Sequence, residues 1–187
     1  KLWDRTMNLF HSFLRRHYGE VMWAISSLGF TFGDNSLLSK TEKKDKKQML
    51  AILTRVFPNL DTRGAAYVLR GLAKMGFQWE RDMSAEILLP SYKEPVEPMA
   101  KIVSLYLKRQ NFREHDYAVL LSSMGALGVR FHDNLSSGIV VKLSRVAPYV
   151  SSHFSSQSLS CALQGLATCG VVWREMAGGE EVRQAYY

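Results

Sequence analysis

The sequence predicts an all-α fold, an α-solenoid of about four paired-helix repeats within a single domain. First, the nine-residue segment GLAKMGFQW at 71–79 recurs as GLATCGVVW at 165–173. Second, a glycine followed three positions later by an aromatic residue occurs four times, at Gly29, Gly76, Gly128 and Gly170. Third, these glycines are 47, 52 and 42 residues apart. Periods of about 20 to 50 residues with two helices per unit are typical of α-solenoids.

A helix is predicted immediately before each of these four glycines. Apolar residues lie one, four and seven positions before the glycine, on one face of a helix with 3.6 residues per turn. They are Met22, Ile25 and Leu28, then Leu69, Leu72 and Met75, then Leu121, Met124 and Leu127, then Leu163, Leu166 and Cys169. The closing glycine is expected to adopt the left-handed conformation of a helix C′ residue. Glycine within a helix costs roughly 1 kcal/mol, so Gly71 and Gly165 predict close approach of a neighbouring helix.

An upstream helix is predicted in each unit, and proline ends it in the matching segments LTRVFP at 53–58 and LSRVAP at 143–148. The predicted units are residues 1–37, 38–84, 99–135 and 136–177, with an insertion at 85–98. Segments 39–48 (SKTEKKDKKQ) and 89–98 (LPSYKEPVEP) are expected to be connections that absorb the uneven spacing. The aromatic residue after each glycine is expected to pack under the next unit.

The composition favours a polyanionic partner. The chain of 187 residues has 47% apolar content, enough for a substantial core, and no run of about 20 apolar residues, so no membrane partner is expected. Its 24 Lys and Arg exceed its 17 Asp and Glu, which gives a net charge of +7. This charge favours nucleic acid as the partner; the alternative is that the charge serves solubility or attachment to a larger assembly. Because the chain begins at Lys1, we expect an internal fragment or a processed chain.

The motifs expected of an enzyme are missing, and we predict no catalytic residue, no cofactor and no metal. The histidines are dispersed, and only His115 is flanked on both sides by acidic residues, Glu114 and Asp116, which are expected to open a helix and interact with its dipole. Cys161 and Cys169 lie about 12 Å apart by helical rise, too far for a disulfide, and are predicted to be small core residues. Neither a P-loop nor a GxGxxG motif is present.

Basic residues are the candidate nucleic-acid-binding residues. Arg55 and Arg145 recur near the ends of upstream helices, where a cation either stabilises exposed carbonyl groups or provides one phosphate contact per unit along a groove. Arg70 and Lys74 lie one turn apart, on the side of their helix away from Leu69. The predicted set is Arg15, Arg16, Arg55, Arg70, Lys74, Lys108, Arg109, Lys142 and Arg145.

Two further groups of residues leave alternatives open. The lysine run at 40–47 is expected to be the solvated start of a helix, with a mobile phosphate-binding arm as the alternative. The aromatic side chains of Tyr18, Tyr67, Tyr106 and Tyr117 could stack on bases. Their positions in the pattern instead predict core or helix-start residues.

The segment FSSQSLSCALQGLATCGVVW at 154–173 resembles organellar helical repeats of the octotricopeptide and heptatricopeptide types, which often accompany a RAP domain. Segment 60–79 matches nearly as well, and 112–131 and 13–32 less closely. The resemblance implies a paired-helix solenoid that contacts single-stranded or ribosomal RNA, in organellar RNA processing or translation or in a mitochondrial ribosome. It also implies a mitochondrial or other organellar location, with the cytoplasm otherwise. The alternative function is a protein–protein interaction scaffold, as an assembly subunit or a bacterial effector module.

Overall fold

The computed structural model describes residues 2–13, 17–32, 38–87, 96–109, 112–130 and 154–171, and these form an all-α structure. Its α-helices are α1 (Leu2–Leu9), α2 (His17–Ser27), α3 (Lys40–Val56), α4 (Thr62–Lys74), α5 (Met99–Arg109), α6 (Glu114–Ala126) and α8 (Ser156–Thr168). Short 3₁₀ turns η1 (Phe10–Ser12) and η2 (Phe57–Asn59) and a π-helical turn η3 (Trp79–Met83) accompany them. Within the described ranges, the β pairing is an isolated bridge between Ile87 and Val96, and no helix could span a membrane.

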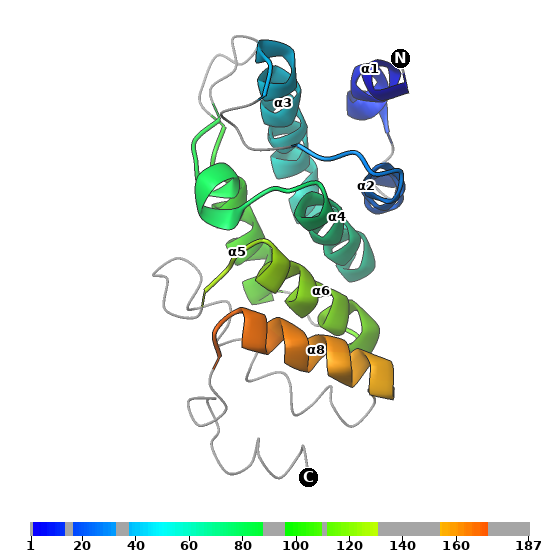
Figure 1. Cartoon of the computed structure of the whole chain (residues 1–187), viewed down its shortest axis with the longest axis vertical. Coiled ribbons are helices and arrows are strands. Elements are labelled where there is room, and N and C mark those ends of the chain that lie inside the picture. The colour runs from blue at the N-terminus through cyan, green and yellow to red at the C-terminus, as the bar shows by residue number, and fades with distance from the viewer. Residues whose placement is uncertain are drawn as a thin grey trace.

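Helices α2, α4, α6 and α8 lie side by side in chain order and form a row, each in contact with the next (Figure 1). Helices α3 and α5 contact each other and lie beside this row. Each helix of the row is the one predicted before a glycine–aromatic motif. The two ends of the predicted insertion pair through the Ile87–Val96 bridge, whereas residues 88–95 and the upstream helix predicted at 143–148 lie outside the described residues.

The row helices all end in the predicted way. Gly29, Gly76, Gly128 and Gly170 have φ values of 80°, 82°, 82° and 78°, in the left-handed region that only glycine adopts without strain. After each of these four glycines, the next residue donates its backbone N–H to a carbonyl group within the preceding helix. Side-chain oxygens of Asp61 and Ser155 cap the starts of α4 and α8.

Two glycines allow the row helices to approach closely, as the sequence predicted. A Cβ atom at Gly71 would lie 2.8 Å from the Met22 carbonyl oxygen of α2. A Cβ atom at Gly165 would lie 2.5 Å from the Leu121 carbonyl carbon of α6. Because these neighbours are backbone atoms, they cannot move aside as a flexible side chain would.

Consecutive units are joined by the aromatic residue that follows the glycine. Phe32 donates its backbone N–H to the Met75 carbonyl at 2.8 Å, and Trp79 donates to the Leu127 carbonyl at 2.7 Å. The Phe32 ring also packs edge-on against Phe77, with ring centroids 5.4 Å apart. The expectation that this aromatic residue packs under the next unit is therefore confirmed for Phe32, and Trp79 is buried and hydrogen-bonded to the loop after α6.

Segment 39–48 is not a connection, contrary to the prediction, because α3 begins at Lys40 and continues through it to Val56. Ser39 starts the helix with a capping box, in which its hydroxyl accepts from the Glu42 N–H and its own N–H donates to the Glu42 carboxylate. The alternative of a mobile arm is wrong for the same reason. Pro58 falls in η2, two residues beyond the last residue of α3.

The predicted apolar faces are buried except at the two ends of the row. Leu28 of α2 is 66% exposed, although Met75, Leu127 and Cys169, at the matching position, are buried. Leu163 of α8 is 37% exposed, whereas its counterparts, which include Leu69, are buried. An end helix of the described row has a neighbour on one side only, so one part of its apolar face is not covered.

Candidate nucleic-acid interface

One face of the helix row is exposed along its whole described length, and we call it the row face. It is formed by the residues six and two positions before each C′ glycine, which are one helical turn apart. These residues are Trp23 and Ser27 on α2, Arg70 and Lys74 on α4, Ser122 and Ala126 on α6, and Gln164 and Thr168 on α8, all of them exposed. The row face therefore presents a different pair of side chains from each helix.

A groove between α4 and α6, the cationic groove, has a volume of about 280 Å³. Arg70 and Lys74 line it from α4, and Ser122 lines it from α6. Its remaining lining residues are Ala73, Val119, Ser123, Ala126 and Cys161. Of the described residues around it, none carries a carboxylate, so the charge that the groove presents is positive.

A second groove between α2 and α4, the aromatic groove, has a volume of about 440 Å³. It is lined by Glu20, Trp23, Ala24, Arg63 and Tyr67. The Trp23 side chain is 49% exposed, and the Arg63 guanidinium lies over the Tyr67 ring, 5.6 Å from its centroid. The charges in this groove are mixed, since Glu20 faces the same cavity as Arg63.

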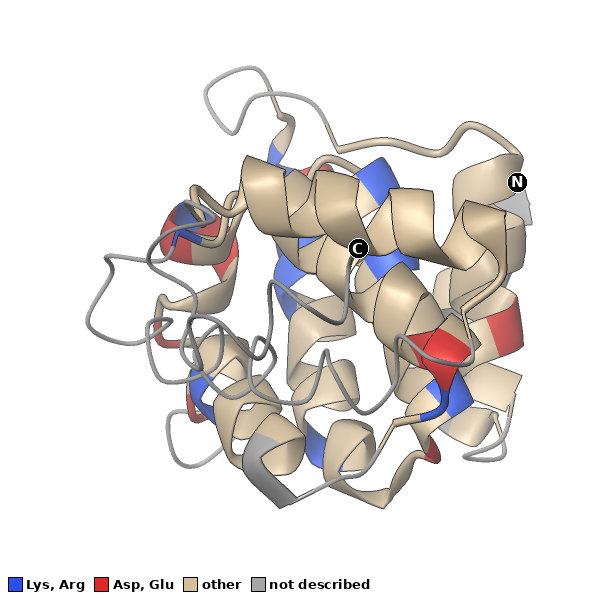
Figure 2. Ribbon diagram, turned by 90° about the horizontal axis from the view of Figure 1, so that it is seen from below, with Lys and Arg blue, Asp and Glu red and all other residues tan. Residues whose placement is uncertain are grey.

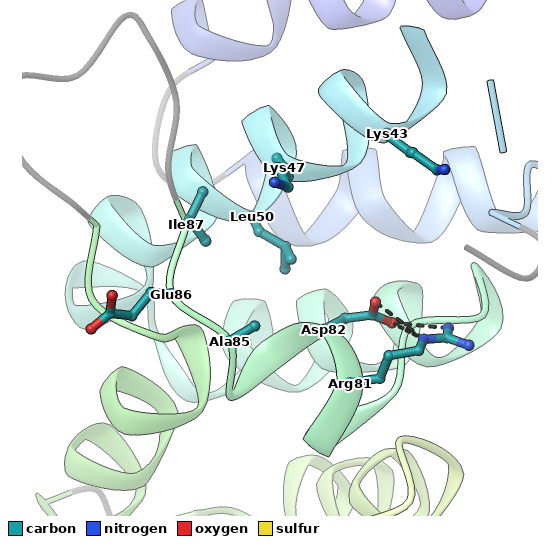
Figure 3. A pocket seen from close by; sticks show the side chains of 8 residues that line it. All are labelled: Lys43, Lys47, Leu50, Arg81, Asp82, Ala85, Glu86 and Ile87. Atoms are coloured by element: carbon teal, nitrogen blue, oxygen red, sulfur yellow. Dashed lines mark hydrogen bonds and ion pairs between the residues drawn. The ribbon is translucent and has the colours of Figure 1, made fainter. Parts of the chain in front are cut away.

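A third pocket, of about 390 Å³, lies between α3 and η3, with Lys43, Lys47, Arg81, Asp82 and Glu86 in its lining (Figure 3). Figure 3 shows the Arg81 guanidinium directed at Asp82, whereas Glu86 points away from this pair. Three cations are thus accompanied by two carboxylates. This balance makes the pocket a weaker site for a phosphate than the cationic groove.

Beneath this pocket, Lys46 and Asp82 form a buried ion pair with an Nζ–Oδ1 distance of 2.9 Å. The Asp82 carboxylate also accepts from Arg81 and from the Gln78 backbone N–H, and Lys46 Nζ lies 4.9 Å from the Phe77 ring centroid. A buried charge with so many partners joins η3 to α3. Lys46 is therefore structural, and the expectation of a solvated lysine run is wrong at this position.

The structure brings together two of the predicted cations, Arg70 and Lys74. Arg55 is exposed in the last turn of α3 and does not line the cationic groove, and the backbone of Lys108 and Arg109 ends α5. Arg15, Arg16, Lys142 and Arg145 lie outside the described residues. Figure 2 shows Lys and Arg on several helices, with acidic residues among them.

Burial separates the four predicted tyrosines. Tyr18, Tyr106 and Tyr117 are buried as expected, and burial is the main cause that raises the pKa of Tyr106 to about 12. Its hydroxyl donates to the Leu60 carbonyl at 2.9 Å. Tyr67 is half-buried in the wall of the aromatic groove, so its assignment to the core is wrong.

The two cysteines also differ. Cys169 is in the core as predicted, and burial raises the pKa of its thiol to about 11. Cys161 is half-buried, so its assignment to the core is confirmed only in part: it packs against the core and also lines the cationic groove. His115 is exposed in the first turn of α6, and the described residues hold no group of three or more potential metal ligands.

Sequence reasoning missed Trp23 and Arg63. Trp23 occupies the same place in its unit as Arg70, six residues before the C′ glycine. The alignment that identified the buried positions could have found Trp23, because a large aromatic residue at a solvent-facing position is unusual. Arg63 had no such signal, since only the fold places it over Tyr67.

No family model matches this chain, and no curated protein or solved structure is detectably similar to it. The geometry and charge of the grooves therefore carry the functional argument. Among the three cavities described above, the cationic groove is the one best suited to a polyanion, and the aromatic groove beside it shares helix α4.

Proposed function

We propose that this protein is a non-catalytic α-solenoid module of about four paired-helix repeats that binds single-stranded RNA across the row face. Repetition supports the solenoid: four C′ glycines share one conformation, and two consecutive junctions use the same backbone hydrogen bond. The partial exposure of the end helices also fits a stack in which each unit is covered by its neighbours. Each unit would therefore contribute one helix to a continuous binding surface.

The observation that carries the RNA proposal is the cationic groove. Arg70 and Lys74 lie one turn apart, both are exposed, and both face a concave surface whose described lining has no carboxylate. Cations placed in this way neutralise successive phosphates and release counterions, so affinity falls as salt rises. The neighbouring hydroxyl of Ser122 can donate to a phosphate or sugar oxygen.

The biological setting that we propose follows from the repeat resemblance. Organellar RNA processing, translation or a place within a mitochondrial ribosome would each present RNA to such a surface. The module would act by binding and positioning RNA. Proteins of the same assembly would be further partners, and the chain would work in a mitochondrion or another organelle.

The first prediction concerns the double substitution Arg70→Glu and Lys74→Glu. RNA affinity should fall for all sequences alike, and the slope of log affinity against log salt should become shallower by roughly 1.4, about 0.7 for each lost phosphate contact. Titration of a labelled single-stranded oligoribonucleotide at several salt concentrations measures both quantities. The helix fold should be unchanged, because both side chains are exposed.

The matched control is Lys43→Glu with Lys47→Glu, which changes the net charge equally at the mixed-charge pocket on α3. The control should retain most of the affinity. Equal weakening by both variants would show that net charge, rather than the cationic groove, attracts RNA. Absence of binding by the unaltered protein at low salt would refute RNA binding altogether.

A protein-interaction scaffold is the second candidate, and the exposed apolar residues at the ends of the row favour it. Leu28 and Leu163 occupy positions that other units bury against a neighbouring helix, so a partner helix could cover them in the same way. This function predicts that RNA titration fails at low salt.

A further inference from the structure

The two grooves of the row face differ in the ligand chemistry that they suit. Helix α4 separates them, with Arg63 and Tyr67 on the aromatic groove and Arg70 and Lys74 on the cationic groove. An RNA strand alternates between charged phosphates and flat, uncharged bases. A surface with a cationic groove beside an aromatic one offers a separate place for each part.

We propose that the aromatic groove stacks an unpaired RNA base on the Trp23 indole while the adjoining phosphates lie toward the cationic groove. This inference rests on the proposed RNA-binding function and names the part of the ligand that the aromatic groove takes. The Trp23 side chain is half exposed, whereas Trp79, in the core, is 1% exposed. An exposed aromatic side chain beside a cationic groove is the arrangement that single-strand-binding proteins use to hold bases.

The charges of the aromatic groove favour a base over a phosphate. Glu20 lies on α2 one turn before Trp23 and lines the same cavity, so its carboxylate repels a phosphate placed there. The same carboxylate accepts hydrogen bonds from the N–H groups on base edges. The Arg63 guanidinium lies over the Tyr67 ring, and both side chains line the groove from α4, across from Trp23 on α2.

The neighbouring cations favour RNA over a protein side chain as the occupant. An apolar peptide segment would fit the indole but would gain nothing from Arg70 and Lys74, one helix turn further along α4. A base carries its own phosphates, so one ligand satisfies both grooves. The cationic groove, at about 280 Å³, is smaller than the aromatic groove, at about 440 Å³, which agrees with the larger group lying beside Trp23.

The test is Trp23→Ala compared with Trp23→Phe, titrated with a short oligoadenylate and with an abasic oligomer of equal length. Loss of a stacked base should weaken oligoadenylate binding roughly 5- to 150-fold in Trp23→Ala, and Trp23→Phe should recover most of it. The salt slope should not change, since no phosphate contact is lost. The abasic oligomer should bind the unaltered protein and Trp23→Ala equally. The matched control is Leu28→Ala, which removes another exposed apolar side chain, just after the end of α2. This variant should bind oligoadenylate with the affinity of the unaltered protein.

Tryptophan fluorescence provides a second measurement for the case in which the Trp23 variants and the unaltered protein bind with similar affinity. The fluorescence difference between the unaltered protein and Trp23→Phe reports on Trp23 alone, and oligoadenylate, but not the abasic oligomer, should quench it. If Trp23→Ala binds oligoadenylate with unchanged affinity and RNA does not quench Trp23 fluorescence, the stacking proposal is overturned. The proposed RNA-binding function still stands in that case if the double variant Arg70→Glu with Lys74→Glu weakens binding. Trp23 would then be a protein-contact residue. Failure of every variant and of the unaltered protein to bind refutes both proposals.

Discussion

The same four helices form two regions: the buried contacts between neighbouring helices of the row, and the exposed row face. Side chains repeat from helix to helix in the first region and vary in the second. At the contacts, position by position, the units resemble one another: Leu72, Met124 and Leu166 are all buried four residues before the glycine. On the row face, the position six residues before the glycine holds Trp23, Arg70, Ser122 or Gln164. The inner positions repeat, and the outer positions do not.

This difference shows where the constraint on each residue comes from. Helices in contact must interlock, so their shared positions accept few side chains. A side chain on the row face contacts solvent, and its substitution costs little stability. Specialisation for a ligand can therefore accumulate on the row face alone, which is where the proposed RNA contacts lie.

The largest effect on stability is expected from Lys46→Met, which removes one member of the buried ion pair. Asp82 would keep Arg81 and the Gln78 N–H but lose its fully buried cation, so the free energy of unfolding should fall by about 3 kcal/mol. Denaturant unfolding followed by circular dichroism measures this loss. Lys47→Met, the exposed neighbour, should change stability by less than about 0.5 kcal/mol. Similar losses in the two variants would contradict a structural role for Lys46.

A smaller loss is expected from Gly165→Ala at the contact between α6 and α8. The added methyl group would lie 2.6 Å from the Ser122 backbone nitrogen, so the two helices must separate, at a cost of about 1–3 kcal/mol. Alanine otherwise favours a helix by roughly 1 kcal/mol over glycine. A fall in the free energy of unfolding would show that the steric clash dominates, and a rise would show that the helix propensity of alanine dominates. Gln164→Ala, one residue away on the row face, is the control and should be nearly neutral.

The smallest structural disturbance is expected from chemical modification of the cysteines. Cys161 lines the cationic groove and should react with a thiol reagent in the native protein. Cys169 is buried, and its pKa of about 11 keeps it protonated at neutral pH, so it should react only after unfolding. Comparison of Cys161→Ser with Cys169→Ser assigns each rate. Bound RNA should slow the reaction of Cys161, and equal rates with and without RNA would place RNA elsewhere.

The helices of the row and their ends could be predicted from the sequence because they depend on local chemistry. Apolar spacing, a glycine at C′ and small residues such as Gly71 and Gly165 each act within a few turns of the helix that they belong to. The adjacency of Arg70 and Lys74 on one exposed face was predictable for the same reason.

Features that depend on distant residues could not be predicted. The burial of Lys46 requires Asp82, which η3 brings to α3 from 36 positions away in the chain, so a lysine run that resembles a solvated surface contains one core residue. Tyr67 and Cys161 face grooves because of how the row helices are spaced, although their own helices contain many core residues.

The sequence by itself determined which segments become the row helices, where these helices stop and which of their faces are apolar, because these features follow from periodicity and backbone conformation. Only the tertiary structure decided which charged side chains are buried and which meet across a groove. Burial and electrostatic interaction depend on distances in space between residues that are far apart in the chain.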